Sequence, residues 1–187
     1  MTALPRAAAL WLVVFVAGYA WAYGAANWIM TGSALLVSSQ AVSSLMVDLA
    51  WDLDLLWRLL FGHHLIGGTE YMWDARYPLW VRLMSLFHVV WPPLVIGVLR
   101  RLGYDSRGFA LQCAIASVVF VGSRFVLPGE NLNYAFRDPF FHRSWGPAPV
   151  HLGLTLAVLF AAVYWPTHRL LRWIAPQRAE PGAQVPP

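Results

Sequence analysis

The segment GFALQCAIASVVFVGSRFVL, residues 108–127, contains a single charged side chain, Arg124. A helix of about 20 predominantly apolar residues is long enough to cross the hydrocarbon core of a bilayer. Comparable runs occupy residues 7–30, 79–99 and 147–166. Of the 187 residues 59% are hydrophobic and 12% are charged, which is about half the charged share of an ordinary soluble domain. The sequence therefore predicts an all-α integral membrane protein.

Arginine positions predict the orientation of these spans. The chain contains no lysine, and short loops rich in Arg or Lys stay on the cytoplasmic side of a membrane. The segments after the second and the last of these four runs hold Arg100, Arg101, Arg107, Arg169, Arg172 and Arg178. We therefore expect a multi-pass protein of the bacterial inner membrane with a cytoplasmic C-terminus. Residues 67–77 and 128–147 then face outward.

The chain is predicted to form one membrane domain over residues 1–174. Residues 175–187, APQRAEPGAQVPP, are polar and rich in proline, which predicts a disordered cytoplasmic tail. Residues 7–22 also have the form of a cleavable signal peptide, because Arg6 precedes an apolar run that ends in Ala-Trp-Ala. The apolar run continues beyond that point, which favours an uncleaved span.

Residues 45–61, LMVDLAWDLDLLWRLLF, allow two interpretations. At about 100° per residue, leucine and tryptophan side chains cover one broad face of a helix. The other face carries Ser44, Asp48, Asp52, Asp54 and Arg58. Three aspartates near the centre of a span would each cost about 2.5 to 3.5 kcal/mol. We therefore expect four transmembrane helices and one amphipathic helix at the outer interface, with Asp54 paired to Arg58. The alternative is five transmembrane helices with the N-terminus outside.

Ionisable side chains inside apolar spans are costly to bury and are functional candidates by default. His88 lies about halfway along its span, shortly before Pro92 and Pro93, which interrupt backbone hydrogen bonding and predict a kink. His151 lies near the outer end of the last span. Each histidine is a candidate acid or base, and the alternative is a neutral imidazole bonded to a neighbouring helix.

A second set of polar residues falls in or beside the expected outer loops. It comprises Glu70, Asp74, Arg82, Arg124, Glu130, Asn131 and Asn133. These residues either form an outer binding site, in which Arg124 holds an anionic headgroup and Glu130 acts as an acid or base, or form a structural rim. In the second case the asparagines bond the backbone of a turn that begins at Pro128.

The sequence predicts no metal site, no particular cofactor and no nucleic-acid partner. His63 and His64 are suitable metal ligands, but adjacent side chains on a helix diverge by about 100°, and no His-Glu-x-x-His pattern occurs. No nucleotide-binding or nucleophile-elbow pattern occurs either. The net charge of +4 agrees with membrane orientation better than with a nucleic-acid interface.

Five ordered motifs lie between residues 67 and 168: GGTEYMWD, SLFHVVWPPL, RRLGYDSRGFALQ, PGENLNYAF and VYWPTH. Together they resemble a family of small polytopic bacterial membrane proteins that carry names such as "membrane-associated protein". The likeness extends over a little more than half of the chain. It departs from the family pattern at Tyr134 and Ala135, where the family has Trp-Val. The resemblance implies a polytopic membrane fold and transfers no catalytic residue.

The favoured function is that of a non-catalytic accessory or assembly subunit of a larger respiratory, photosynthetic or transport complex. Eleven tryptophans and short loops suit a protein that contacts lipids and partner helices. The alternative is an intramembrane enzyme that acts on a lipid or another amphiphile at the outer interface. A proton or ion pathway is the least expected function, because the inner half offers few polar residues beyond Gln112.

Overall fold

The computed structural model describes residues 32–125, 131–139 and 141–178. The expected span at residues 7–30 and the candidate Glu130 lie outside the described residues, as do Pro128 and residues 179–187. The described residues are helical apart from loops and one isolated backbone bridge between Tyr104 and Gln177. The expectation of an all-α fold is confirmed for this part of the chain.

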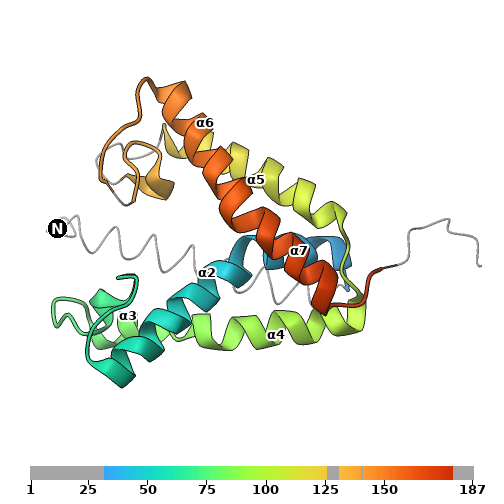
Figure 1. Ribbon diagram of the computed structural model, residues 1–187, viewed down its shortest axis with the longest axis horizontal. Helices are drawn as coiled ribbons and strands as arrows, with labels where there is room; N and C mark the ends of the chain where they lie inside the picture. The colour runs from blue at the N-terminus through green and yellow to red at the C-terminus, as the bar shows by residue number, and fades with distance from the viewer. Residues whose placement is uncertain (1–31, 126–130, 140, 179–187) are drawn as a thin grey trace, which may run out of the picture.

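The longest helix, α2, spans Ala34–Phe61 and packs against most of the other described helices (Figure 1). The side chain of Ser33 accepts a hydrogen bond from the Leu36 N–H at 3.4 Å, which caps the first turn. Gly62 ends the helix at φ 77°, a left-handed conformation that favours glycine. The helix expected over residues 45–61 is therefore the second part of a longer one.

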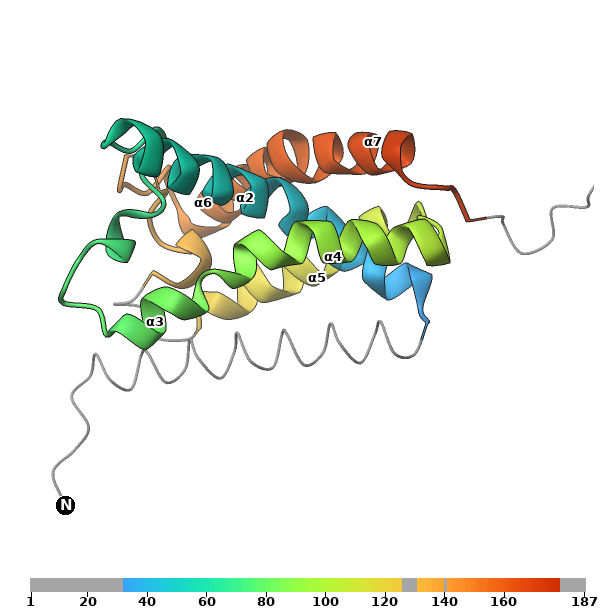
Figure 2. The ribbon, with the colours of Figure 1, turned by 90° about the horizontal axis from the view of Figure 1, so that it is seen from below.

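Three further helical segments surround α2 (Figure 2). They are α3 (Leu79–Met84) with α4 (Phe87–Leu102), then α5 (Arg107–Ser123), and finally α6 (Ala148–Val158), the π-helical η4 (Leu159–Tyr164) and α7 (Trp165–Ile174). Short 3-10 turns, η1 (Glu70–Met72) and η3 (Leu132–Tyr134), lie in the connecting loops. Three described segments are long and apolar enough to cross a membrane: Ala34–Phe61, Leu79–Leu102 and Ala148–Ile174. The apolar helix α5 is shorter, with 17 residues.

The two ends of the bundle differ in character (Figures 1 and 2). One end, which we call the loop end, carries the connections 62–78 and 131–147. The other, which we call the arginine end, holds residues 100–107 and 169–178. Residues 175–178, expected to begin a disordered tail, are ordered here, because the N–H of Tyr104 donates to Pro176 and the N–H of Arg178 donates to Tyr104.

A helix break lies shortly before His88, at Ser85 and Leu86, between α3 and α4. There the His88 N–H donates to the Ser85 carbonyl at a spacing of three residues. Pro92 has no N–H to donate to the His88 carbonyl, but α4 continues through Pro92 and Pro93. The break is therefore about two turns nearer the loop end than the prolines from which a kink was predicted.

Helix α2 turns its polar side chains inward and its leucines outward. Ser44, Asp48 and Asp54 are all less than 10% exposed. Leu49, Leu53, Leu56 and Leu60 are between 41% and 67% exposed. The expected pair between Asp54 and Arg58 does not form, because loop 62–69 occupies the Asp54 carboxylate. A helix lying on the membrane surface would direct this polar face toward water, whereas here it packs against the other helices.

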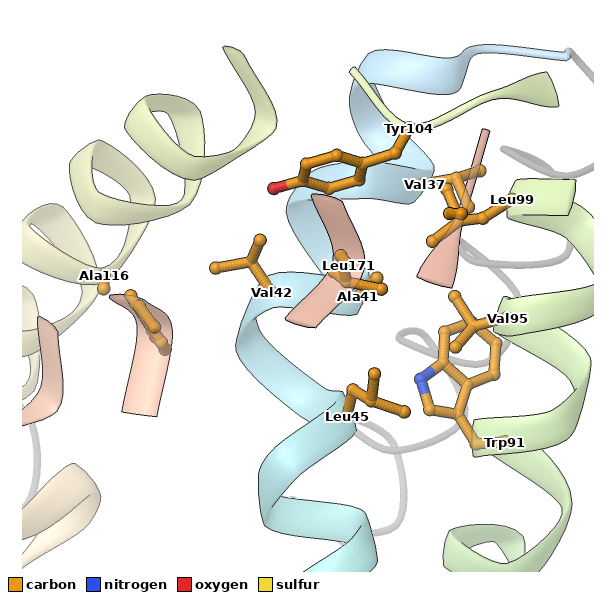
Figure 3. Close-up of a cluster of buried hydrophobic side chains, with 12 residues drawn as sticks. Val37, Ala41, Val42, Leu45, Trp91, Val95, Leu99, Tyr104, Ala116 and Leu171 are labelled. Atoms are coloured by element: carbon orange, nitrogen blue, oxygen red, sulfur yellow. The ribbon is translucent and has the colours of Figure 1, made fainter. Parts of the chain in front are cut away.

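The apolar core fills the arginine-end half of the bundle (Figure 3). It joins α2 to α4 and α7 through Val37, Ala41, Val42, Leu45, Trp91, Val95, Leu99 and Leu171. Gly108 brings the start of α5 against α2, since a Cβ atom there would lie 2.7 Å from the Ser38 Cβ. This close approach fixes α2 between α4 and α5.

Candidate functional site between α2 and α4

Helices α2 and α4 bring a carboxylate and an imidazole together near the middle of α2 and of the combined segment α3–α4. Asp48 is the fifteenth of the 28 residues of α2, and its Oδ1 atom lies 2.5 Å from Nδ1 of His88. Asp48 is 3% exposed, and the His88 side chain is 20% exposed. Trp51 stacks on the His88 ring at 4.8 Å between centroids, and Phe87 lies 4.0 Å from the ring on α4. Aromatic rings therefore hold the imidazole in place.

The contact orients His88 for proton exchange. An ionised carboxylate only accepts hydrogen bonds, so Nδ1 carries the shared hydrogen when Asp48 is charged. The other ring nitrogen, Nε2, has no hydrogen-bond partner among the described residues. It is therefore the ring atom that another group can reach. A carboxylate that fixes the imidazole in this way is the arrangement of an acid–base pair.

Two carboxylate oxygens beside this pair lack donors. Asp48 Oδ2 and Asp52 Oδ1 are buried and have no hydrogen-bond partner within the described structure. Asp52 follows Asp48 by one helical turn, so both side chains lie on the same face. The Asp52 carboxylate is attracted by His88 and repelled by Asp48. Because an unsatisfied buried acceptor is costly, the cluster favours a bound proton or another hydrogen-bond donor.

His151, the second histidine candidate, has a structural role at the loop end. Its ring is fully buried, the Trp145 N–H donates to Nδ1 at 3.3 Å, and Nε2 lies 3.0 Å from the Tyr134 carbonyl. Nδ1 therefore carries no hydrogen, and Nε2 donates to the carbonyl. Since the backbone engages both nitrogens, the ring ties loop 131–147 to α6 and has no position left for a substrate.

Arg124, Asn131 and Asn133 also hold this loop. Arg124 donates to the Ala135 carbonyl at 2.7 Å, and its guanidinium lies 4.1 Å from the centre of the Phe136 ring. Asn131 accepts the N–H groups of Phe136 and Arg137 at 2.9 Å each. Asn133 donates to Ser123 Oγ at 2.7 Å. Both asparagines have positive φ, which asparagine tolerates better than most residues. Asn131 thus bonds the backbone of this loop, as expected, whereas Asn133 bonds a side chain, contrary to the expectation.

Glu70, Asp74 and Arg82 belong to the other loop. Arg82 donates to the Met72 carbonyl at 3.1 Å, and Glu70 begins the short turn η1. Asp74 pairs with Arg76 at 2.6 Å, and hydrogen bonds from Arg76 lower the pKa of this carboxyl. Among the described members of the predicted outer cluster, no hydrogen bond or ion pair joins this loop to Arg124, Asn131 or Asn133. The six side chains therefore belong to two separate connections and do not converge on one site.

Asp54 organises loop 62–69 and was missed as a key residue in the sequence. Its Oδ1 atom accepts the N–H groups of Leu65, Ile66 and Gly67 at 2.7 to 3.1 Å. Its Oδ2 atom accepts the N–H and the hydroxyl of Thr69, and lies 3.1 Å from the Nδ1 atom of His64. The carboxylate is fully buried, and these donors satisfy it. In the sequence, the Gly67-Gly68 pair soon after the helix was the one sign of a tight loop that could fold back onto Asp54.

Polar contacts also fasten the arginine-end half of α2. The Trp91 indole donates to the Ser44 hydroxyl at 2.6 Å, and the Ser39 hydroxyl donates to the Gln112 side chain at 2.9 Å. Gln112 donates to the Tyr164 hydroxyl at 3.4 Å, and the Asp105 N–H donates to the Ser38 hydroxyl at 2.9 Å. Near them, Tyr104 and His168 approach to 2.7 Å. This half therefore contains more polar groups than the sequence indicated, because α2 was not counted as a span. Such bonds between helices contribute about 0.6 kcal/mol on average inside membranes.

Within the described residues, no group of three or more His, Cys, Asp or Glu side chains is placed to hold a metal ion. Comparisons with models of known protein families, with curated proteins and with solved structures find no match. The resemblance indicated by the five motifs therefore remains a prediction. The fold and the site together define a helical protein with three apolar helices of membrane-spanning length. Two of these helical segments, Ala34–Phe61 and Leu79–Leu102, contact each other through an Asp–His pair about halfway along their length.

Proposed function

We propose that the protein crosses the bacterial inner membrane five times, through residues 7–30, α2, the pair α3–α4, α5 and the segment α6–η4–α7. The inward polar face and the outward leucines of α2 support a span over a surface helix. The arginine end then lies in the cytoplasm, following the positive-inside rule, and the loop end lies outside. The C-terminus is cytoplasmic in this arrangement.

Within that membrane, the proposed role is that of a non-catalytic accessory or assembly subunit of a larger complex. The observation that carries this proposal is the structural use of His151, Arg124 and Arg82, the candidates nearest the outer surface. Each donates to a backbone carbonyl in its own loop. The surface offered along the helices is instead apolar, and lipids and helices of partner subunits are its natural neighbours.

One face of α6 illustrates this surface. Val150, Leu154 and Val158 recur at a spacing of four residues and are 49% to 62% exposed. We name this set the α6 outer face. It presents branched side chains, and no ionisable group belongs to it. A partner helix packs on such a face by shape and dispersion forces.

The test is the size of the protein in mild-detergent extracts of its native membrane, measured by native mass spectrometry. The subunit proposal predicts a stoichiometric complex with other chains, well above the 21.0 kDa of one copy. Val158→Trp should weaken that complex, whereas Leu53→Trp, an equally bulky change on the outward face of α2, is the matched control. A single population of monomers or homo-oligomers from the same membranes would contradict the proposal.

A second candidate function is an intramembrane enzyme, and the Asp48–His88 pair favours it. In that case Nε2 of His88 takes a proton from an amphiphile that enters between the helices from the bilayer, and Asp48 stabilises the imidazolium. Turnover of a lipid-extract substrate by purified protein, lost in His88→Gln and retained in His63→Gln, would support this role. Equal turnover by both variants would exclude it for this pair.

A further inference from the structure

We propose that Asp48, Asp52 and His88 form a binding site for one exchangeable proton, and that this proton reaches the site from the loop end of the bundle. The inference does not depend on the subunit role, since a pH-sensitive centre can regulate assembly, transport or chemistry alike. It rests on the charge balance of the three groups, on two oxygens without donors and on the packing around them.

The charge balance sets the number of protons. With both carboxylates ionised and His88 protonated, the cluster carries a net charge of −1. One additional proton on Asp52 makes it neutral, as Asp48 and the imidazolium already compensate each other. An uncompensated charge midway along a span is expensive, which favours the neutral state.

The hydrogen bonding leads to the same count. Asp48 Oδ2 and Asp52 Oδ1 are buried acceptors that no described residue serves with a donor. Protonation turns the Asp52 carboxyl into a donor and removes one of the two unsatisfied acceptors. The proton comes from water at the loop end and returns there when the site releases it. No other atom changes partner in this step.

The surrounding helices supply no second positive charge to the cluster. From α2 itself, Asp52 faces Asp48, and from α4 it faces His88; these are the charged groups that act on it. Among the described ionisable residues of the other helices, Arg107, His168, Arg169 and Arg172 lie at the arginine end, and Cys113 is a thiol that supplies no positive charge. Arg82, Arg124 and His151 bond to backbone carbonyls near the loop end. Arg58 lies in the last turn of α2, against the Trp73 ring. Asp54 is saturated by its own loop. A proton is therefore the simplest balancing charge.

Access differs between the two ends. Toward the arginine end, Leu45, Val95 and Leu99 are fully buried and close the space between α2 and α4 (Figure 3). Toward the loop end, Asp52 is half-buried, and Trp51 donates to the Tyr71 hydroxyl at 3.2 Å, beside loop 62–78. Because the packed core closes the arginine end, the proposed proton enters and leaves from the loop end, and the site binds it without conducting it.

Infrared spectroscopy of the full-length protein in nanodiscs tests the occupancy of the site. We expect one protonated-carboxyl band near neutral pH that disappears as the pH is raised. It should be absent in Asp52→Asn and weakened in Asp48→Asn, because there the His88 imidazolium alone neutralises the Asp52 carboxylate. The band should shift in His88→Gln and stay unchanged in the control Asp74→Asn. The Asn and Gln variants conserve side-chain shape, and circular dichroism of each checks that the fold is retained. Absence of the band at every pH from 5 to 9, or its persistence in Asp52→Asn, would overturn the proposal.

Oriented proteoliposomes test the side of access. A pH jump on the loop-end side should change the band, whereas the same jump on the arginine-end side should leave it unchanged. A vesicle-trapped pH dye should report equal proton leak for the wild-type protein and Asp48→Asn. A band that follows the arginine-end pH, or a leak that Asp48→Asn abolishes, would contradict a one-sided site. Loss of the band response does not alter complex size, so this test is independent of the subunit proposal.

Discussion

Replacing Asp54 by Asn removes the charge that organises loop 62–69 while keeping the size of the side chain. The carboxylate accepts four backbone N–H groups and one hydroxyl, all between 2.5 and 3.1 Å. The Asn oxygen can still serve one side of the site. Its NH2 group then faces the Thr69 N–H, which loses its acceptor, while the Thr69 hydroxyl can turn to accept instead. The remaining hydrogen bonds no longer go to a charged group, so each of them is weaker.

Hydrogen bonds to a charged group contribute about 1.5 to 3 kcal/mol each, and contact of the freed loop with water offsets part of the loss. We therefore expect loop 62–69 to be destabilised by about 2 to 4 kcal/mol. That free energy corresponds to opening that is about 30- to 700-fold more frequent. The affected amides are those of Leu65, Ile66, Gly67 and Thr69.

Hydrogen–deuterium exchange of detergent-solubilised protein measures this opening amide by amide. The control Asp74→Asn removes a partly exposed carboxylate in the same connection. It should leave exchange at these amides unchanged, because the bonds of this carboxylate among the described residues go to Arg76. Helix α2 itself should keep its protection in both variants. Wild-type exchange at Leu65 and Ile66 in Asp54→Asn would refute the assignment of Asp54 as the organiser of the loop.

Two further predictions concern the arginine end. Gly108→Ala should destabilise the protein by about 1 to 3 kcal/mol, because the added Cβ atom would lie 2.7 Å from the Ser38 Cβ atom and α5 must shift. Thermal unfolding in detergent measures this loss. The control is Gly122→Ala, because nothing lies within 4 Å of a Cβ atom at that position. An unchanged melting temperature in Gly108→Ala would contradict the close packing. Hydrogen bonds from Arg107 hold the pKa of Asp105 below its ordinary value of about 3.9. The ionised Asp105 carboxylate therefore stabilises the fold above that pH. This contribution is lost as the pH falls through the pKa of the folded state. The stability difference between wild type and Asp105→Asn should thus be largest near neutral pH and shrink in acid, and a difference that is constant from pH 7 to pH 3 would argue against it.

Much of the helical architecture follows from the sequence. The runs 79–99 and 147–166 are almost uninterrupted in apolar residues, and both lie within helices of spanning length. Helix α2 was harder to predict, because the cost of its aspartates was counted without their partners. His88 lies 40 residues away from Asp48, and the donors to Asp54 lie in a loop whose path the sequence does not specify.

The candidate site was only half predictable for the same reason. His88 stood out, as an ionisable residue halfway along an apolar run is rare. Its partner Asp48 belonged to a segment interpreted as a surface helix, so the pair was not recognised. His151 and Arg124 were given possible chemical roles, but their partners are backbone groups of loop 131–147. Such partners depend on positive φ angles at Asn131 and Asn133, which hydrophobic periodicity does not reveal.

The central claim is that α2 crosses the membrane with Asp48 and His88 near its middle. Cysteine accessibility in a Cys113→Ser background tests it, with Ser33→Cys at the start of α2 and Glu70→Cys beyond its end. A membrane-impermeant maleimide added to intact cells with a permeabilised outer membrane should label Glu70→Cys and leave Ser33→Cys unlabelled until the inner membrane is opened. Labelling of both cysteines from the same side would contradict a spanning α2 and return the helix to the membrane surface.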